Sequence, residues 1–239
     1  MKKFLALAAL AAVSAAPSYA DTLADWTFET SAFTSVTNTG TAPLNTSIAP
    51  EVGAGSATGL HASSSTFWQT PTGNGSTKSL SSDHWTQGDY YQFSTTLDQA
   101  NSTYSGFSLS YSQNGSGTGP KTYGLSYSLD GSTFTQFGSD YTLTASITWN
   151  STTAQGTQES FDLGSITALN TANTVYFRVF DDSPATGGAI SGGNVGTGGT
   201  GRIDDFTISA TVVPIPEPSS LAIGIVGGLA ALTVWKRKK

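Results

Sequence analysis

The sequence predicts an all-β domain, a two-sheet antiparallel sandwich, over residues 21–212. Short runs of alternating apolar and polar residues recur in this region, separated by clusters of Gly, Ser, Asn and Asp. No window of eleven or more residues sustains the apolar period of a helix. Roughly eight or more strands at this spacing fit a two-sheet sandwich better than a small barrel.

Individual strands are predicted from the alternation of their side chains. Apolar residues share one parity within 91–97, 107–111 and 123–129, with Ser or Thr repeatedly on the opposite face, which is typical of half-buried strands. Residues 174–180 are apolar at both parities, as in a central strand covered on both faces, and 202–212 form a last strand. Asp130-Gly131 and Asn114-Gly115 are predicted tight turns, because such pairs accept positive φ angles.

The N-terminus has the features of a secretory signal peptide. Lys2 and Lys3 precede an apolar run over 4–13, and the small residues Ser18 and Ala20 follow with the spacing that a signal peptidase recognises. The sequence therefore predicts a signal peptide over residues 1–20, cleaved between Ala20 and Asp21, and export across the inner membrane.

The C-terminus has the features of a short membrane anchor. Residues 221–235 are a run of fifteen mostly apolar residues, followed by four basic residues at 236–239. As a helix this run is about 22 Å long, a short transmembrane helix compared with a hydrocarbon core of roughly 30 Å. The basic cluster favours the cytoplasmic side, so the body is expected on the outer side of the inner membrane.

Pro216-Glu217-Pro218 stands directly before this helix. The three prolines at 214, 216 and 218 keep the preceding segment extended. With its apolar helix and basic end, the segment 213–239 resembles the PEP-CTERM sorting signal, also called the ice-binding protein C-terminal domain. The resemblance implies an exosortase-type processing enzyme as a partner, and transient anchoring in the inner membrane before release to the cell surface or the extracellular matrix.

Charge and composition exclude several classes of function. Of 10 Lys and Arg residues, six lie in the terminal clusters, so residues 4–235 carry four basic against 16 acidic residues, a balance of 4 − 16 = −12. Such a chain repels nucleic acid, whereas neutral sugars and cations remain acceptable partners. With no Cys and only two His, thiolate nucleophiles and most zinc sites are excluded.

The body has a second resemblance. The segments Trp26-Thr27-Phe28-Glu29, 107–113, 127–134 and 202–206 resemble landmarks of jelly-roll modules of the galactose-binding-like type. Those modules are mostly carbohydrate-binding, and many carry a structural calcium ion. By this resemblance one Ca²⁺ is expected between Glu29 and Asp204 or Asp205. A concanavalin-like sandwich remains open as an alternative.

Asp204 shares its parity with Phe206 and Ile208, so a regular strand turns its carboxylate into the core. A buried carboxylate needs a partner, either Arg178 or a bound cation. The alternative is a register slip at Asp204-Asp205 that leaves both side chains solvated.

Exposed aromatic rings hold sugars by stacking, and Trp68, Trp85 and Trp149 are the main candidates, with Tyr90 and Tyr104 beside them. His84, next to Asp83, has no nucleophile near it in sequence, so no catalytic residue is assigned.

We expect a non-catalytic, polysaccharide-binding surface protein. The alternatives are a purely structural or adhesive protein, and a glycoside hydrolase using the acid pairs at 181–182 and 204–205.

Overall fold

The computed structural model describes residues 20–30, 35–37, 44 and 47–215. The predicted signal peptide, apart from Ala20, and the tail from Pro216 onward lie outside the described residues. Within the described part, no helix is long and apolar enough to cross a membrane.

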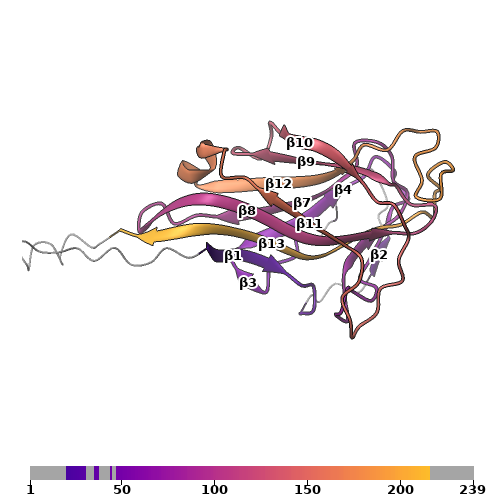
Figure 1. Ribbon diagram of the computed structural model, residues 1–239, viewed down its shortest axis with the longest axis horizontal. Coiled ribbons are helices and arrows are strands. Elements are labelled where there is room, and N and C mark those ends of the chain that lie inside the picture. Colours follow the sequence, from indigo (N-terminus) through magenta and orange to yellow (C-terminus); the bar gives the residue numbers. More distant parts are fainter. Residues whose placement is uncertain (1–19, 31–34, 38–43, 45–46, 216–239) are drawn as a thin grey trace, which may run out of the picture.

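The domain is an antiparallel sandwich of two sheets, which confirms the predicted fold class (Figure 1). Sheet A contains β1 (Ala20–Trp26), β2 (Ser35–Thr37), β3 (Val52–Gly53), β5 (Phe67–Gln69), β6 (Leu80–Ser82), β8 (Ser102–Gly115), β11 (Thr157–Asp162) and β13 (Gly201–Pro214). Sheet B contains β4 (Gly55–Leu60), β7 (Tyr90–Thr96), β9 (Thr122–Ser128), β10 (Thr135–Thr142) and β12 (Thr174–Asp181). A 3₁₀ helix, η1 (Thr167–Thr171), precedes β12.

The chain passes repeatedly from one sheet to the other, as in a jelly roll. Sheet A has the order β11-β8-β13-β6-β5-β2, with β1 on β13 and β3 on β1, and sheet B has the order β10-β9-β12-β7-β4. Since β1 pairs antiparallel with β13, the start of the first strand lies beside the end of the last, at one end of the sandwich (Figure 1).

The core lies between the sheets and follows the predicted parities. Val175, Phe177 and Val179 of β12 are fully buried. Phe93 of β7 stacks on Phe206 of β13 with ring centroids 3.6 Å apart, which joins the two sheets at their centre. The alternation in the sequence therefore identified the inward faces of β7 and β13 correctly.

Two local predictions are corrected. Asn114-Gly115 is no turn, because β8 runs through both residues and Asn114 binds the backbone of Ile147 through its side chain. Strand β12 is central in sheet B, but only its inward parity is fully buried, and the outward side chains are partly exposed. Asp130-Gly131 does form the β9–β10 turn, with Gly131 at φ 74°.

Candidate functional site

The outer face of sheet B carries a row of partly exposed aromatic and polar side chains. Because successive side chains alternate across a strand, β12 directs Tyr176, Arg178 and Phe180 outward. The neighbouring strand β7 contributes Tyr90 opposite Phe180 and Gln92 opposite Arg178. Together with Phe134 from the β9–β10 turn, these residues form what we call the aromatic face.

Two glycines give the rings their space on this face. A Cβ atom at Gly124 would lie 2.3 Å from Cζ of Phe180, so the Phe180 ring lies over this glycine. A Cβ atom at Gly131 would lie 3.1 Å from Cζ of Tyr176, and Gly131 is at positive φ as well. The rings therefore lie close to the backbone of sheet B and its turn.

Arg178 is held at the centre of the aromatic face. Its guanidinium carbon lies 3.8 Å from the ring centroid of Tyr90 and 3.5 Å from that of Phe134, so the cation is sandwiched between two rings. Its Nε donates a hydrogen bond of 2.9 Å to Oε1 of Gln92. Partial burial lowers the pKa of Arg178, although a guanidinium stays charged at neutral pH.

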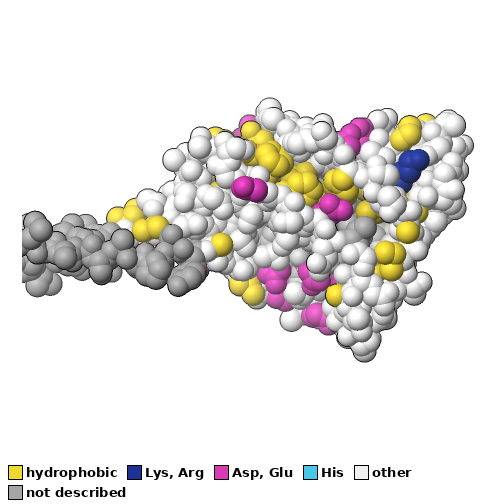
Figure 2. Space-filling view, in the orientation of Figure 1, with side chains coloured by type: hydrophobic (Ala, Val, Ile, Leu, Met, Phe, Trp, Pro, Cys, Tyr) yellow, Lys and Arg dark blue, Asp and Glu magenta, His cyan; other side chains and the backbone are white. Residues whose placement is uncertain are grey.

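A carboxylate pair marks one end of the face. Asp140 and Asp182 interact through their side chains, and partial desolvation together with the hydrogen bond and charge of Asp182 raises the pKa of Asp140. Two amides approach the pair: Gln136 Nε2 donates to Asp140 and Gln87 Nε2 to Asp182, both at 2.7 Å. Acidic side chains are also spread over the side seen in Figure 2, where basic ones occupy one small area.

A hollow of about 340 Å³ adjoins this end of sheet B. It is lined by Leu60, His61, Ala62, Gln87, Gly88 and Asp89. Leu60 pairs with Tyr90 across β4 and β7, and Gln87 contacts Asp182, so two lining residues of the hollow neighbour the aromatic face.

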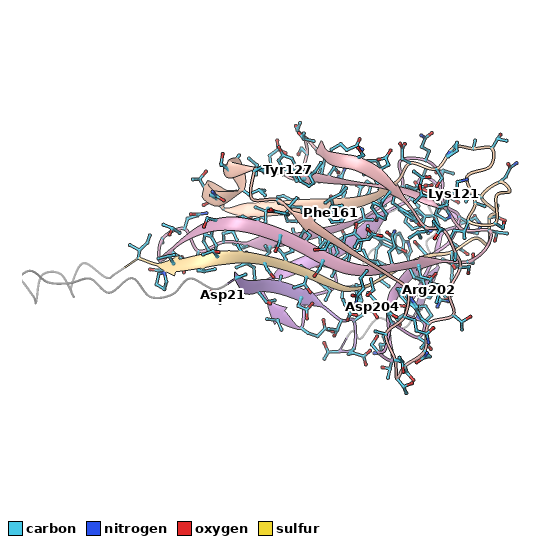
Figure 3. The ribbon with its side chains drawn as sticks, in the orientation of Figure 1. Asp21, Lys121, Tyr127, Phe161, Arg202 and Asp204 are labelled. Atoms are coloured by element: carbon cyan, nitrogen blue, oxygen red, sulfur yellow. The ribbon has the colours of Figure 1, made fainter. Side chains whose placement is uncertain are left out.

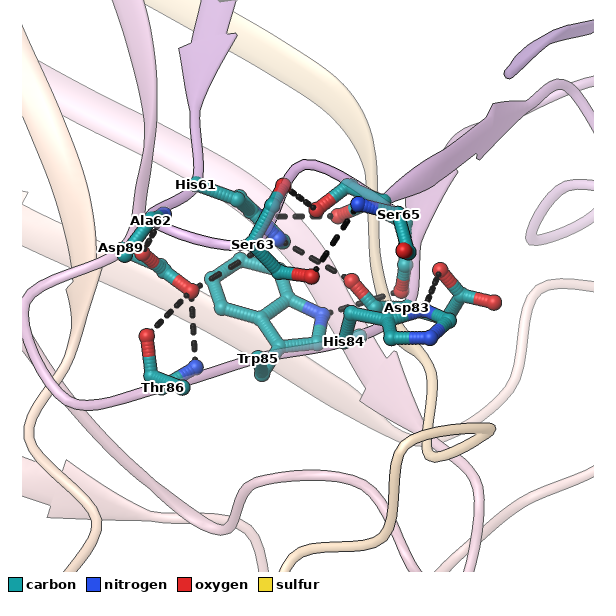
Figure 4. Close-up of polar contacts among 12 residues, drawn as sticks. His61, Ala62, Ser63, Ser65, Asp83, His84, Trp85, Thr86 and Asp89 are labelled. Atoms are coloured by element: carbon teal, nitrogen blue, oxygen red, sulfur yellow. Dashed lines mark hydrogen bonds and ion pairs between the residues drawn. The ribbon is translucent and has the colours of Figure 1, made fainter. Parts of the chain in front are cut away.

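Beside the hollow lies a buried polar network (Figure 4). His61 is fully buried, its Nδ1 contacts the Asp83 carbonyl at 3.0 Å, and burial lowers its pKa to about 3. His84 Nδ1 lies 2.7 Å from the carboxylate of Asp83, its neighbour in the sequence. The Ser82 hydroxyl near His61 is buried, so solvent and substrate do not reach it. The network ties the turns around β6 and β7 together.

The three tryptophans predicted to stack on sugars are buried, and this prediction is wrong in this structure. Trp68 is 0% exposed, and Trp85 and Trp149 are 4% exposed. Trp68 and Trp85 pack around His61 and Tyr91 inside the sandwich. Tyr104 is buried as well, whereas Tyr90 belongs to the aromatic face. Composition shows how many aromatic residues exist, but not which of them the core needs.

Asp204 is both bulged and buried. The β8–β13 register shifts after Asp204, and Asp205 takes φ 51°. Asp204 is 0% exposed, and its Oδ2 accepts hydrogen bonds of 2.7 Å from Asn74 N and Ser76 Oγ. Its Oδ1 accepts the Asp205 N–H at 3.0 Å. Arg178 lies in sheet B and is not its partner, so that prediction is corrected.

Glu29 binds the same loop as Asp204. Thr77 Oγ1 donates to Glu29 Oε2 and Lys78 N donates to Glu29 Oε1 at 2.7 Å. Burial opposes ionisation of Glu29, but these hydrogen bonds outweigh it and lower its pKa. Figure 3 shows Asp204 toward the opposite end of the sandwich from Asp21. Glu29 and Asp204 therefore both bind the loop over residues 73–78.

The described residues do not, however, form a calcium site as they stand. The carboxylates of Glu29 and Asp204 are occupied by hydrogen bonds from the loop. Asp205 is partly buried, and burial and the charges of Asp25 and Glu29 raise its pKa. Among the described ranges, no group of three or more His, Asp or Glu side chains could hold a metal ion. Calcium therefore stays a prediction.

The acid pairs of the hydrolase alternative have separate partners. Asp181, in sheet B, accepts the Ser183 N–H at 2.8 Å, and Asp204, in sheet A, binds the loop over 73–78. Burial raises the pKa of Asp181 to about 6 and that of Asp204 to about 7. These shifts come mainly from desolvation inside the fold, so they are not the sign of an acid–base couple.

Fold and site together define an all-β sandwich with an aromatic face on its five-stranded sheet. No protein-family model matches the chain, and no curated protein matches it. Among solved structures, the chain is similar to the CBM22-1 xylan-binding domain of Xyn10C from Paenibacillus barcinonensis, with 9% identity, 82% of this chain and 98% of that chain covered, and a TM-score of 0.35.

Two further structures show a remote likeness. The K1 cleaved adhesin domain of Lys-gingipain from Porphyromonas gingivalis W83 has 15% identity, with 81% of this chain and 98% of that chain covered and a TM-score of 0.35. TmCBM61 in complex with β-1,4-galactotriose has 12% identity, with 55% and 70% covered and a TM-score of 0.28.

Sequence reasoning missed most of the aromatic face. The signal was present in residues 174–180, where the outward parity carries Tyr176, Arg178 and Phe180. Apolar residues at both parities predict a central strand covered on both faces, and the outward rings are hidden in that pattern. The position of Phe134 over Arg178 depends on the path of the β9–β10 turn, which no periodicity in the sequence reveals.

Proposed function

We propose that the protein is an exported, non-catalytic component of the cell surface or extracellular matrix that binds polysaccharide on the aromatic face. The observation that carries this proposal is the row of Tyr176, Arg178 and Phe180 on the outside of a sheet, where a soluble β-sandwich ordinarily places small polar side chains. Rings held against the sheet offer stacking surfaces to sugar rings, and Gln92 offers hydrogen bonds.

The first prediction concerns this face. Tyr90→Ala and Tyr176→Ala each remove one stacking surface, so we expect the affinity for a retained polysaccharide to fall about tenfold or more, equivalent to about 1.4 kcal/mol. Affinity electrophoresis of the purified protein in gels containing neutral and weakly acidic polysaccharides measures the effect.

Val213→Ala is the matched control, because Val213 is 48% exposed and lies on β13 of the other sheet. Thermal melts check that all three variants fold. If no polysaccharide retards the wild type, or if the control loses as much affinity as the two tyrosine variants, the proposal is wrong.

The second prediction concerns the two ends of the chain. We propose that a signal peptidase cuts after Ala20 and that an exosortase-type enzyme cuts near Pro216-Glu217-Pro218, which releases the body from the inner membrane. Native protein from a host with such an enzyme should then lack both terminal segments in intact-mass measurements. A mature protein that still carries Lys236–Lys239 would contradict this proposal.

A structural or adhesive role is the second candidate, and the burial of Trp68, Trp85 and Trp149 favours it. These side chains serve packing, so the body needs no ligand to account for its tryptophans. Lack of polysaccharide binding together with unchanged cell-surface attachment of the native protein would select this role.

The third prediction concerns the binding of calcium to the folded protein. If Ca²⁺ binds between Glu29 and Asp204 or Asp205, EDTA should lower the Tm of the purified protein and millimolar calcium should restore it. Asp204→Ala should abolish the response. An unchanged Tm in the wild type removes calcium and leaves the loop over 73–78 as the partner of both carboxylates.

A further inference from the structure

Arg178 is a cation for which the described structure provides no counter-ion. The ion pairs between His61 and Asp89 and between His84 and Asp83, in the part of the chain that the structure describes, do not involve Arg178. Nε of Arg178 is used by Gln92, which leaves the Nη groups as the donors available to a ligand. The rings of Tyr90 and Phe134 orient the guanidinium plane but do not neutralise its charge.

This arrangement suits an anion with two neighbouring oxygen acceptors, such as a carboxylate. A guanidinium offers parallel N–H donors that match the two oxygens of a carboxylate, and such paired bonds are stronger than bonds between neutral groups. The guanidinium is already held in place, so a ligand gains these bonds with little loss of side-chain freedom. Tyr176 and Phe180 lie two residues away on either side, about 6.7 Å along the strand.

The surroundings limit how much negative charge a ligand can bring. Asp140 and Asp182 lie at the Phe180 end of the face, since a Cβ atom at Gly124 would contact both Phe180 and Asp140. The balance of −12 over residues 4–235 also repels a densely charged polyanion. A mainly neutral polysaccharide with an isolated carboxylate is repelled little by Asp140 and Asp182 or by the net negative charge.

We infer that Arg178 is the receptor for a uronic acid, and that the ligand is a mainly neutral polysaccharide with isolated uronic acid residues. This inference rests on the proposed function, because it names the ligand class of the same face. Arg178 has a competing structural role, which is to fasten the turn that carries Phe134 onto sheet B. The two roles predict different binding affinities. If Arg178 binds the ligand, the protein binds a uronate more tightly than its neutral counterpart, whereas a purely structural Arg178 gives no such difference.

The experiment compares glucuronoxylan with its carboxyl-reduced form, which keeps the sugar rings but loses the charge. We expect the purified protein to bind glucuronoxylan at least tenfold more tightly in 20 mM salt, with a smaller difference at higher salt. Arg178→Gln should bind both forms alike, at the affinity of the wild type for the reduced form. Lys121→Gln is the control, because the Lys121 ammonium is bound to the Gly187 carbonyl away from this face and the preference should persist.

The outcomes separate the inference from the proposed function. Equal binding of both forms by the wild type overturns the role of Arg178 but leaves polysaccharide binding in place. Binding of neither form overturns both. Tighter binding of alginate, in which every residue is a uronate, overturns the restriction to sparsely charged chains. If Arg178→Gln fails to fold, the comparison of the two polymers with the wild type still decides the inference.

Discussion

Replacing Asp204 by alanine should lower the free energy of unfolding by about 3 kcal/mol or more. The substitution removes the fully buried acceptor of three donors, Asn74 N, Ser76 Oγ and Asp205 N. Of these, Ser76 Oγ can still donate to the Lys78 carbonyl, whereas the buried Asn74 N–H loses its partner. It also detaches the loop over 73–78 from β13. Urea denaturation of the purified protein measures the change.

The neighbouring residue provides the control. The Asp205 carboxylate accepts no hydrogen bond within the described residues, and it lies near the charges of Asp25 and Glu29. Asparagine tolerates the positive φ of this position, so Asp205→Asn should change stability by less than about 1 kcal/mol. Equal losses in the two variants would show that the bulge matters and the buried carboxylate does not.

The Asp204 carboxyl group should also make stability depend on pH. Burial raises its pKa from 3.8 to about 7, although three hydrogen bonds favour the ionised form. Between these two values the folded state holds a proton that the unfolded state has released. The contribution of this group to stability is therefore fully present below about pH 4 and is lost as the pH rises to 7, at up to about 1.4 kcal/mol per pH unit. Asp204→Asn, which cannot ionise, should show a flatter curve.

Replacing Gly59 by alanine should cost about 2–3 kcal/mol, because it overpacks the core. A Cβ atom at this position would lie 2.2 Å from Cη2 of Trp68, a ring that is fully buried against His61 and Tyr91. The ring cannot move away without displacing these neighbours. Urea denaturation followed by tryptophan fluorescence reports both the stability and the environment of the ring.

A double-mutant cycle tests the cause. Trp68→Phe removes the part of the ring that meets the new methyl group, so the cost of Gly59→Ala should be smaller in that background. Gly193→Ala is the control, because no atom lies within 4 Å of the added Cβ and the change should stay within about 0.5 kcal/mol. The mechanism is refuted if Gly59→Ala costs as much in the Trp68→Phe background as it does in the wild type.

The sequence by itself determined the fold class and the inward faces of the main strands. Alternation at Tyr91 and Phe93, and at Phe107, Leu109 and Tyr111, is a local property of an extended chain, and these residues are all buried as predicted. The need of the Asp204 carboxylate for a partner was also visible, because its parity with Phe206 is local. The export signal and the sorting tail are sequence features too, and they stay predictions.

Only the tertiary structure decided which chemistry-bearing residues come together. The partners of Asp204 are Asn74 and Ser76, about 130 residues earlier in the chain, and their approach depends on how a loop folds over the sheet. The tryptophans became core because the space between the sheets is filled by whichever large side chains the registers bring there. Arg178 meets Tyr90 and Phe134 for the same reason: three segments converge through strand pairing and a turn. A periodic pattern records the face on which a residue lies, whereas a site depends on long-range register, which is set by packing of the whole domain.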